Sequence, residues 1–305
     1  MDLATGTAET DAGYGSLGRG LDFLWLELTY RCNLNCVHCY TDSGPYSGNR
    51  DLLTVEDYRG VMRQARDLGC GKLQLIGGEP QLSKDFGTVL TDAKAYGFGT
   101  IEVFTNLTKL EPATVAFAAA NDIRFLTSIH SSDETAHDAI TRVRTSHARS
   151  LRNLRVLLEA GIPTSAAVTV VDQAESDVAE TERFLRAMGV QHVTVSPTRK
   201  LGRAMQIGSV PEQQDELCGH CWAGKLCITP DGTAYPCVMA RHSPVGNVRE
   251  TPLAEIVQGA ALGAFRHKVH AELWSGVGDR TRQTCVPDQA GCEVPVNDVM
   301  LEAAE

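Results

Sequence analysis

Short apolar runs alternate with longer amphipathic runs along most of the chain. A short apolar run between turn residues indicates a buried strand, and apolar positions spaced three and four apart indicate a helix. The pattern predicts six strands, at 21–30, 72–78, 101–106, 123–130, 163–171 and 191–197. It predicts helices between them at 55–69, 83–96, 111–120, 146–160 and 175–188, and most of these end at a glycine.

This strand–helix order predicts an α/β fold with a parallel sheet and right-handed crossovers. Six units are two fewer than a closed eight-fold barrel requires. A partial (β/α)6 barrel and an open doubly wound sheet therefore fit the periodicity equally well. In both folds the chemistry collects at the carboxyl ends of the strands.

The pattern changes after about residue 205, where the chain becomes rich in cysteine, glycine and proline. TPDGT (229–233) is a hairpin turn signal between two short strands, and a helix is expected from 252 to 259, extending toward 270. We therefore expect three parts: a flexible leader at 1–20, a barrel at 21–205 and a small cysteine-rich α+β domain at 206–305.

Composition and charge narrow the possible partners and location. The chain has 305 residues, 43% of them hydrophobic, and a net charge of −10. A nucleic-acid partner is unexpected because binding phosphate backbones requires a basic surface. No run reaches the roughly 18 apolar residues of a membrane span, and the first residues lack the basic start and apolar stretch of a signal peptide. We expect a cytoplasmic protein without a membrane partner.

The ten cysteines indicate metal chemistry, because disulfides are rare in a reducing compartment. Cys70 stands apart before an apolar run and is expected to be a buried structural thiol. The stretch RCNLNCVHCY, directly after the first strand, places Cys32, Cys36 and Cys39 within eight residues. Three alternatives apply: an apolar helix face, a zinc site completed by His38, or an iron–sulfur cube. His38 is adjacent to Cys39, and neighbouring residues rarely aim at one metal.

Three thiolates on a four-iron cube leave one iron free to bind a small molecule, as the open position does in catalytic zinc sites. The CxxxCxxC loop after the first strand resembles the signature of the radical S-adenosylmethionine (SAM) enzymes, and the resemblance covers nearly the whole chain. It implies a partial barrel fold and a [4Fe-4S] cluster on Cys32, Cys36 and Cys39. It further implies that SAM binds the open iron and is reductively cleaved to a 5′-deoxyadenosyl radical.

The resemblance also implies a SAM pocket. IGGEP (76–80) at the end of the second strand matches the family motif that holds the SAM amino group, so Gly77, Gly78 and Glu79 carry over. In FTNLT (104–108) a leucine replaces the glycine that relatives often carry. Further expected cofactor-binding residues, each with a structural role as the alternative, are His38, Tyr40, Asn106, Ser128 and Arg142.

The C-terminal cysteines resemble the SPASM and twitch domains of these enzymes, which carry auxiliary iron–sulfur clusters. The matching stretches are C-x4-GTAYPC and VGNVRETPLAEIV. Two fully ligated clusters need about eight thiolates, and only six cysteines follow Leu217. We therefore expect one auxiliary cluster, with structural zinc as the alternative. The expected ligands are Cys221, Cys227 and Cys237, with Cys292 or Cys285 as the fourth.

Cys218 is left over from this ligand set, and it would be a hydrogen donor, a substrate anchor or a bystander. SPASM-type enzymes mostly modify ribosomally made peptides. We expect oxidative cross-linking through a thioether or carbon–carbon bond, because an auxiliary cluster can accept an electron from the substrate. The alternatives are peptide Cα epimerisation, dehydrogenation or epimerisation of a small molecule, and a non-catalytic zinc-binding interaction module.

The expected partners follow from this function. They are a peptide substrate and a flavodoxin or ferredoxin-type reductant. No winged-helix peptide-binding domain is recognisable before the barrel, so we also expect a separate leader-recognition protein; the alternative is a substrate that is not a leader peptide.

Overall fold

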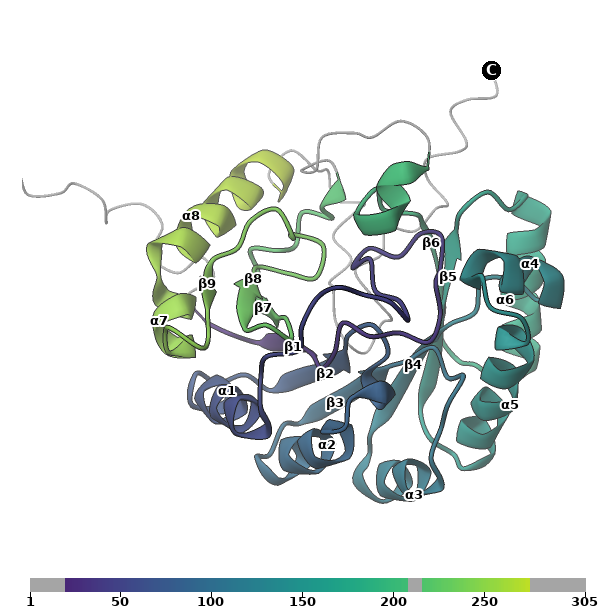
Figure 1. The fold of residues 1–305 in the computed structure, drawn as a ribbon, viewed down its shortest axis with the longest axis horizontal. Coiled ribbons are helices and arrows are strands. Elements are labelled where there is room, and N and C mark those ends of the chain that lie inside the picture. Colours follow the sequence, from purple (N-terminus) through teal and green to yellow (C-terminus); the bar gives the residue numbers. More distant parts are fainter. Residues whose placement is uncertain (1–19, 208–215, 275–305) are drawn as a thin grey trace, which may run out of the picture.

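The computed structural model describes residues 20–207 and 216–274, whose strands form one curved sheet (Figure 1). The strand order is β6-β5-β4-β3-β2-β1-β7-β8-β9. Pairing is parallel from β6 to β7 and antiparallel from β7 to β9. The strand bounds are β1 Phe23–Glu27, β2 Lys72–Ile76, β3 Thr100–Phe104, β4 Arg124–Ser128, β5 Thr164–Val170, β6 Val193–Pro197, β7 Lys225–Ile228, β8 Thr233–Tyr235 and β9 Gly246–Asn247.

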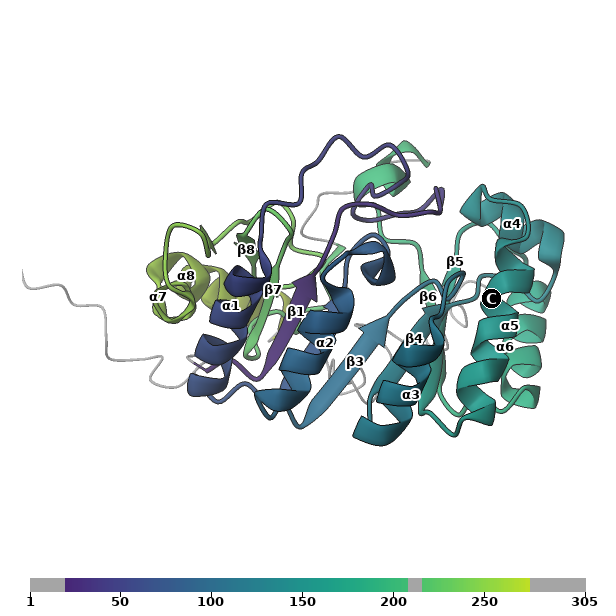
Figure 2. The same cartoon turned by 60° about the horizontal axis from the view of Figure 1, so that its bottom comes forward.

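Figures 1 and 2 show the connecting helices on the outer face of this sheet. One-sided cover and strong curvature make β1–β6 a partial barrel rather than a doubly wound sheet, which confirms the fold class. The helix bounds are α1 Val55–Asp67, α2 Phe86–Ala95, α3 Pro112–Asn121, α4 Glu134–Thr141, α5 Ser146–Glu159, α6 Glu175–Ala187, α7 Leu253–Gln258 and α8 Ala260–Val269, followed by a short π-helical turn, His270–Trp274.

Two helical predictions differ from the structure, and one helix was not predicted. The helix expected from residue 83 begins at Phe86, and the chain before it forms a separate 3-10 turn, Pro80–Leu82. The helix expected from 252 toward 270 is two helices, because the extended backbone of Gly259 ends α7 and begins α8. Helix α4 was not predicted; Asp133 caps its start by accepting a hydrogen bond from Ala136 N at 2.8 Å.

The central strand β1 is buried on both faces and separates two environments. Leu24 and Leu26 pack into the core between the sheet and its helices, which also contains the predicted buried thiol Cys70. Phe23 and Trp25 point to the opposite side, where they pack with Cys227 and Cys237. The alternation of side chains along a strand therefore gives β1 one core face and one face toward the barrel interior.

The cysteine-rich segment continues the barrel sheet. Strand β7 pairs in parallel with β1, with Trp25 opposite Cys227. TPDGT forms the predicted hairpin between β7 and β8, and Gly232 adopts a φ of +91 there. Apart from Gly20, the expected leader lies outside the described residues. The tail cysteines Cys285 and Cys292 also lie outside them. Across the described part of the chain, no helix has the length and apolarity to span a membrane.

Candidate active site

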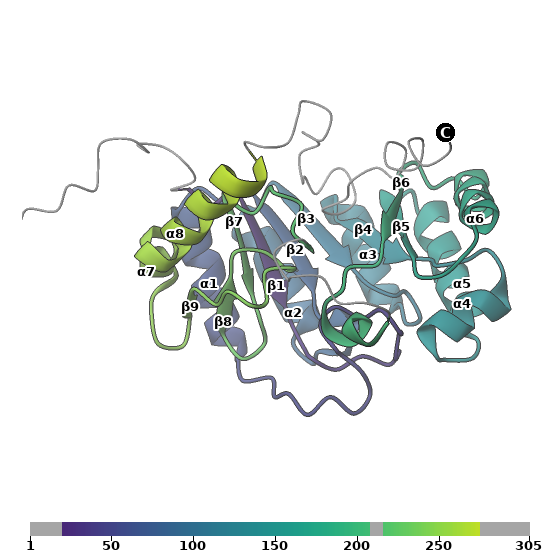
Figure 3. The same cartoon turned by 90° about the horizontal axis from the view of Figure 1, so that it is seen from above.

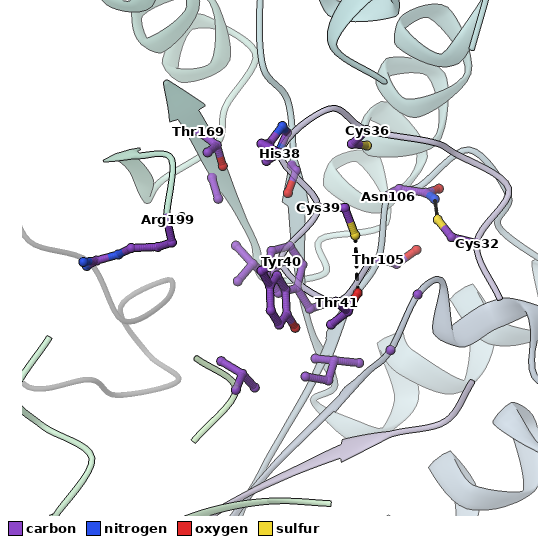
Figure 4. Close-up of a pocket in the computed structure, with 18 of the residues that line it drawn as sticks. Cys32, Cys36, His38, Cys39, Tyr40, Thr41, Thr105, Asn106, Thr169 and Arg199 are labelled. Atoms are coloured by element: carbon purple, nitrogen blue, oxygen red, sulfur yellow. Dashed lines mark hydrogen bonds between the residues drawn. The ribbon is translucent and has the colours of Figure 1, made fainter. Parts of the chain in front are cut away.

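A cavity of about 240 Å³ lies at the carboxyl ends of the barrel strands, where the α/β fold predicts chemistry (Figure 4). Its walls come mainly from strands β1–β6, the loop after β1, and the residues after Cys237, with Thr141 of α4, His130 after β4 and Arg199 after β6. The loop after β1 carries Cys32, Cys36 and Cys39, and all three line the cavity. The structure thus brings together the three cysteines expected to bind the cluster.

These three cysteines are half-buried. Burial raises the pKa of Cys32 to about 12 and also raises the pKa of Cys36. The polar contacts of the sulfurs are weak: Cys32 accepts from Asn106 Nδ2 at 3.7 Å, and Cys39 lies 3.3 Å from Thr41 Oγ1. Thiols that resist ionisation become thiolates when a metal cation compensates the charge. This donor set therefore fits an iron cluster.

Helix α4 supports the cysteine loop from one side. The backbone N–H groups of Asn35 and Val37 donate to the carbonyls of Thr141 and Ile140 at 3.0 and 2.9 Å. These carbonyls belong to the last turn of α4, where helical carbonyls lack partners. The unpredicted helix therefore holds the backbone between Cys32 and Cys39.

Gly77 and Gly78 line the cavity and pack against the base of the cysteine loop. A Cβ on Gly78 would lie 2.3 Å from the Arg31 carbonyl oxygen, and one on Gly77 would lie 2.7 Å from that of Thr29. The N–H of Gly78 donates to the Thr29 carbonyl at 2.8 Å. Only glycine permits this approach, so the IGGEP motif and the cysteine loop are one structural unit.

Glu79 does not line the cavity and is completely buried. Its carboxylate accepts hydrogen bonds from Thr105 Oγ1 at 2.7 Å, Asn106 N at 2.8 Å and Gln81 N at 3.1 Å. Burial raises its pKa to about 6, although these hydrogen bonds oppose the shift. Glu79 therefore orders the turn after β3, and its contact with a SAM amino group stays a prediction.

The remaining expected cofactor-binding residues divide into two groups. His38, Tyr40, Asn106 and Ser128 line the cavity. Arg142 does not: it is exposed, and with a φ of +56 it ends α4. The four residues at strand ends and on the cysteine loop therefore lie at the cavity. Arg142 does not, because its position depends on α4, a helix that was not predicted.

Two histidines, His38 and His130, form a polar wall of the cavity. Of the two, only His38 was expected from the sequence. The rings of His38 and His130 meet edge to face at 4.6 Å. The buried Nδ1 atom of each has no hydrogen-bond partner within the described residues. Burial lowers the pKa of His38 to about 4 and lowers that of His130, so both rings are neutral. Neutral imidazoles with free polar atoms fit a polar ligand such as SAM. The position of His130, as the last residue of the predicted strand 123–130, was its only sequence signal.

The described C-terminal cysteines gather behind the opposite wall. Cys221 Sγ lies 2.9 Å from Cys237 Sγ, and Cys218 lies beside Cys221, which lowers the pKa of Cys218. Cys227 is buried in the same cluster of side chains. None of the eight cysteines in the described parts of the chain forms a disulfide. The structure thus groups Cys218 with the expected auxiliary ligands and away from the cavity lining.

The link between this cysteine group and the cavity is short. Val238 and Met239 follow Cys237 directly, and both line the cavity. Phe23, Trp25 and other apolar side chains continue this wall. The cavity therefore lies between two cysteine groups, with a largely apolar region beside the second one.

Comparison with known families agrees with this arrangement. Residues 26–185 match the Radical SAM superfamily, and residues 218–285 match the SPASM iron–sulfur cluster-binding domain. The chain therefore belongs to the radical SAM superfamily and carries a SPASM domain. It is an enzyme whose cofactors are a [4Fe-4S] cluster, SAM and auxiliary iron–sulfur.

Solved structures show the same fold. SuiB from Streptococcus suis, bound to S-adenosylmethionine, aligns with a TM-score of 0.69 and 16% identity over 81% of this chain and 68% of its own. The protein anSMEcpe, with bound AdoMet and Cp18Cys peptide, aligns with a TM-score of 0.61 and 14% identity over 80% of this chain and 81% of its own. At these identities the likeness establishes the fold.

Proposed function

We propose that this enzyme oxidises a ribosomally made peptide, most simply by forming a thioether or carbon–carbon cross-link. The observation that carries the proposal is the position of the cavity between the two cysteine groups. Tyr40, next to Cys39, forms part of one side, and Val238 and Met239, next to Cys237, form part of the other. A substrate held between them would lie between the cluster loop that holds SAM and the cysteine group that would hold the electron-accepting auxiliary cluster.

The proposed reaction balances as the removal of two hydrogens from the substrate. One leaves as a hydrogen atom, transferred to the 5′-deoxyadenosyl group derived from SAM. The other leaves as a proton and an electron when the new bond forms. When bound, the auxiliary cluster supplies the capacity to accept that electron.

Epimerisation requires a different cavity. It needs a thiol that returns a hydrogen atom to the substrate carbon. Among the described residues that line the cavity, the only thiols are Cys32, Cys36 and Cys39, which we assign to the barrel cluster. Cys218 lies beside Cys221 instead. This arrangement supports oxidation over epimerisation.

A peptide substrate is supported by two solved structures that share the fold. SuiB has been crystallised with the precursor peptide SuiA, and anSMEcpe with the Cp18Cys peptide. The apolar wall of the cavity suits an uncharged side chain of such a peptide. A separate leader-recognition protein and a flavodoxin or ferredoxin-type reductant complete the proposed system.

The proposal assigns roles to two parts of the chain. The barrel, 21–205, provides the SAM site, with Gly77, Gly78 and Asn106 beside the cluster loop. The domain at 206–305 provides one auxiliary cluster. Its proposed ligands are Cys221, Cys227 and Cys237, with Cys285 or Cys292 as the fourth. Cys218 would be a hydrogen donor only in the alternative of an epimerase.

The test is the product mass from peptides encoded beside this gene. Reduced enzyme, SAM and each peptide are incubated without oxygen, in ordinary water and in D2O. Cross-linking lowers the peptide mass by two hydrogens in both solvents. An unchanged mass in water together with deuterium gain in D2O, abolished by Cys218→Ala, would instead identify an epimerase. Turnover of a small alcohol but of no peptide would also refute the proposal.

A further inference from the structure

The segment after β6 lies directly on the cysteine loop. Figures 2 and 3 show the short 3-10 helix Gly202–Gln206 beside the loop that follows β1. Gly202 has a φ of +54, and a Cβ there would lie 2.4 Å from the carbonyl oxygen of Cys39 and 2.5 Å from that of Tyr40. No side chain can occupy this contact without moving the loop.

Arg203 then hydrogen-bonds to the loop at four points. Its backbone N–H donates to the Cys39 carbonyl at 2.9 Å. Its guanidinium donates from Nε to the Cys36 carbonyl at 2.8 Å, from Nη2 to the Ser43 carbonyl at 2.7 Å, and from Nη1 to Asp42 Oδ1 at 2.8 Å. One residue thereby constrains the loop backbone from Cys36 to Ser43.

The same side chain brings a positive charge to the cysteines. Arg203 is only 13% exposed, whereas the carboxylate that it meets, on Asp42, is 66% exposed. The guanidinium is hydrogen-bonded to the carbonyl of Cys36 itself, so its charge lies within the cysteine loop. A half-buried cation favours a more negative neighbouring group.

We infer that Arg203, seated by Gly202, is a positioning residue of the SAM-binding cluster: it fixes the backbone of Cys36 and Cys39 and places a cation in the loop that carries them. Three of its four contacts end on backbone carbonyls, so their geometry does not depend on the side chains in the loop. A lysine carries the charge but lacks the planar fork that reaches several acceptors at once. The inference rests on membership of the radical SAM family and not on the identity of the substrate.

The experiment separates geometry from charge. Arg203→Lys keeps the charge, Arg203→Gln removes it, and Gly202→Ala pushes the loop away without altering the arginine. The matched control is Arg186→Ala, which removes an exposed ion pair with Glu182 on α6. For each reconstituted variant we would measure iron content, the midpoint potential of the barrel cluster, and the change in its electron paramagnetic resonance (EPR) spectrum on adding SAM.

Loss of such supporting contacts typically weakens metal binding or activity roughly 10-fold to 100-fold. We expect losses of that size in the SAM-responsive signal for Gly202→Ala and Arg203→Lys. We expect Arg203→Gln to show a similar loss and, in the cluster that remains, a more negative midpoint potential. The auxiliary cluster should persist in every variant and thereby report that the chain has folded. A wild-type SAM-responsive signal and potential in Arg203→Gln and Arg203→Lys would overturn the inference.

Discussion

The guanidinium of Arg241 pairs with the carboxylate of Glu27, 214 residues earlier in the chain. Glu27 is the last residue of β1, just before the cysteine loop, and its side chain is 1% exposed. Arg241 also donates from Nε to the Val238 carbonyl at 2.8 Å and lies 5.6 Å from the centroid of the Tyr40 ring. One cation therefore ties the barrel, the loop beside Cys39 and the turn after Cys237 together.

We predict that Arg241→Met destabilises the protein strongly, because it leaves the Glu27 carboxylate buried without a cation. Breaking a buried pair in this way costs about 3–5 kcal/mol. Urea unfolding followed by circular dichroism measures the loss. The control Lys109→Met removes an exposed pair with Glu111 and should cost about 1 kcal/mol or less. The double variant Glu27→Gln/Arg241→Met should recover part of the loss; equal costs for Arg241→Met and Lys109→Met would contradict the prediction.

We predict that Gly78→Ala removes the SAM-binding cluster. The new methyl group would meet the Arg31 carbonyl at 2.3 Å, so the cysteine loop must shift. The measurement is the EPR change on adding SAM, which should disappear. Gly87→Ala on α2 is the matched control, because no atom lies within 4 Å of its added Cβ. That control should keep the signal and gain roughly 0.5–1 kcal/mol of stability; a retained signal in Gly78→Ala would show that the loop can move without harm.

We predict that replacing Cys32, Cys36 and Cys39 together by alanine abolishes SAM cleavage but keeps the auxiliary cluster. Two four-iron cubes give roughly eight irons in the wild type and roughly four in the variant. Iron analysis and chromatography of 5′-deoxyadenosine measure the two outcomes. Undiminished cleavage would exclude these cysteines as cluster ligands. One zinc per chain together with roughly four irons in the wild type would show that the C-terminal site binds zinc.

Glu79 should make stability fall as pH rises through the weakly acidic range. Its pKa is about 6 in the folded chain, against an ordinary value of 4.5. The folded Glu79 therefore binds more protons than the unfolded one between these values. The contribution of Glu79 to stability decreases with pH in that window, by about 2 kcal/mol in total, and is constant above it.

Glu79→Gln should remove this pH dependence. Unfolding of the cluster-free chain from pH 4.5 to pH 7 would show it as a difference in slope between the wild type and the variant, because the buried neutral His38 and His130 contribute an opposite slope to both. A carbon-13 NMR titration of labelled glutamate should also find one carboxyl group titrating near pH 6 that the variant lacks. A wild-type chain whose glutamates all titrate near 4.5 would contradict the raised pKa.

The barrel elements and the chemistry of the first loop follow from the sequence alone. Local periodicity and glycine stops are sufficient for β1–β6 and for the helices between them except α4, because the strands are short apolar runs and these helices are amphipathic. The placement of Cys32, Cys36, Cys39 and the two glycines at strand ends also follows from the sequence, since parallel strands bring their carboxyl ends to one edge.

Which distant residues support that loop depends on long-range packing. Arg203 and Arg241 lie far from the cysteines in sequence, and their bonds to loop carbonyls and to a buried carboxylate form only when distant segments meet. Helix α4 escaped prediction, and with it the exposed position of Arg142. Phe23 and Trp25 face the barrel interior, and β7 pairs with β1. Both features likewise depend on long-range contacts. Those contacts place the C-terminal cysteines behind the cavity wall, an arrangement that arises only when the chain packs as a whole.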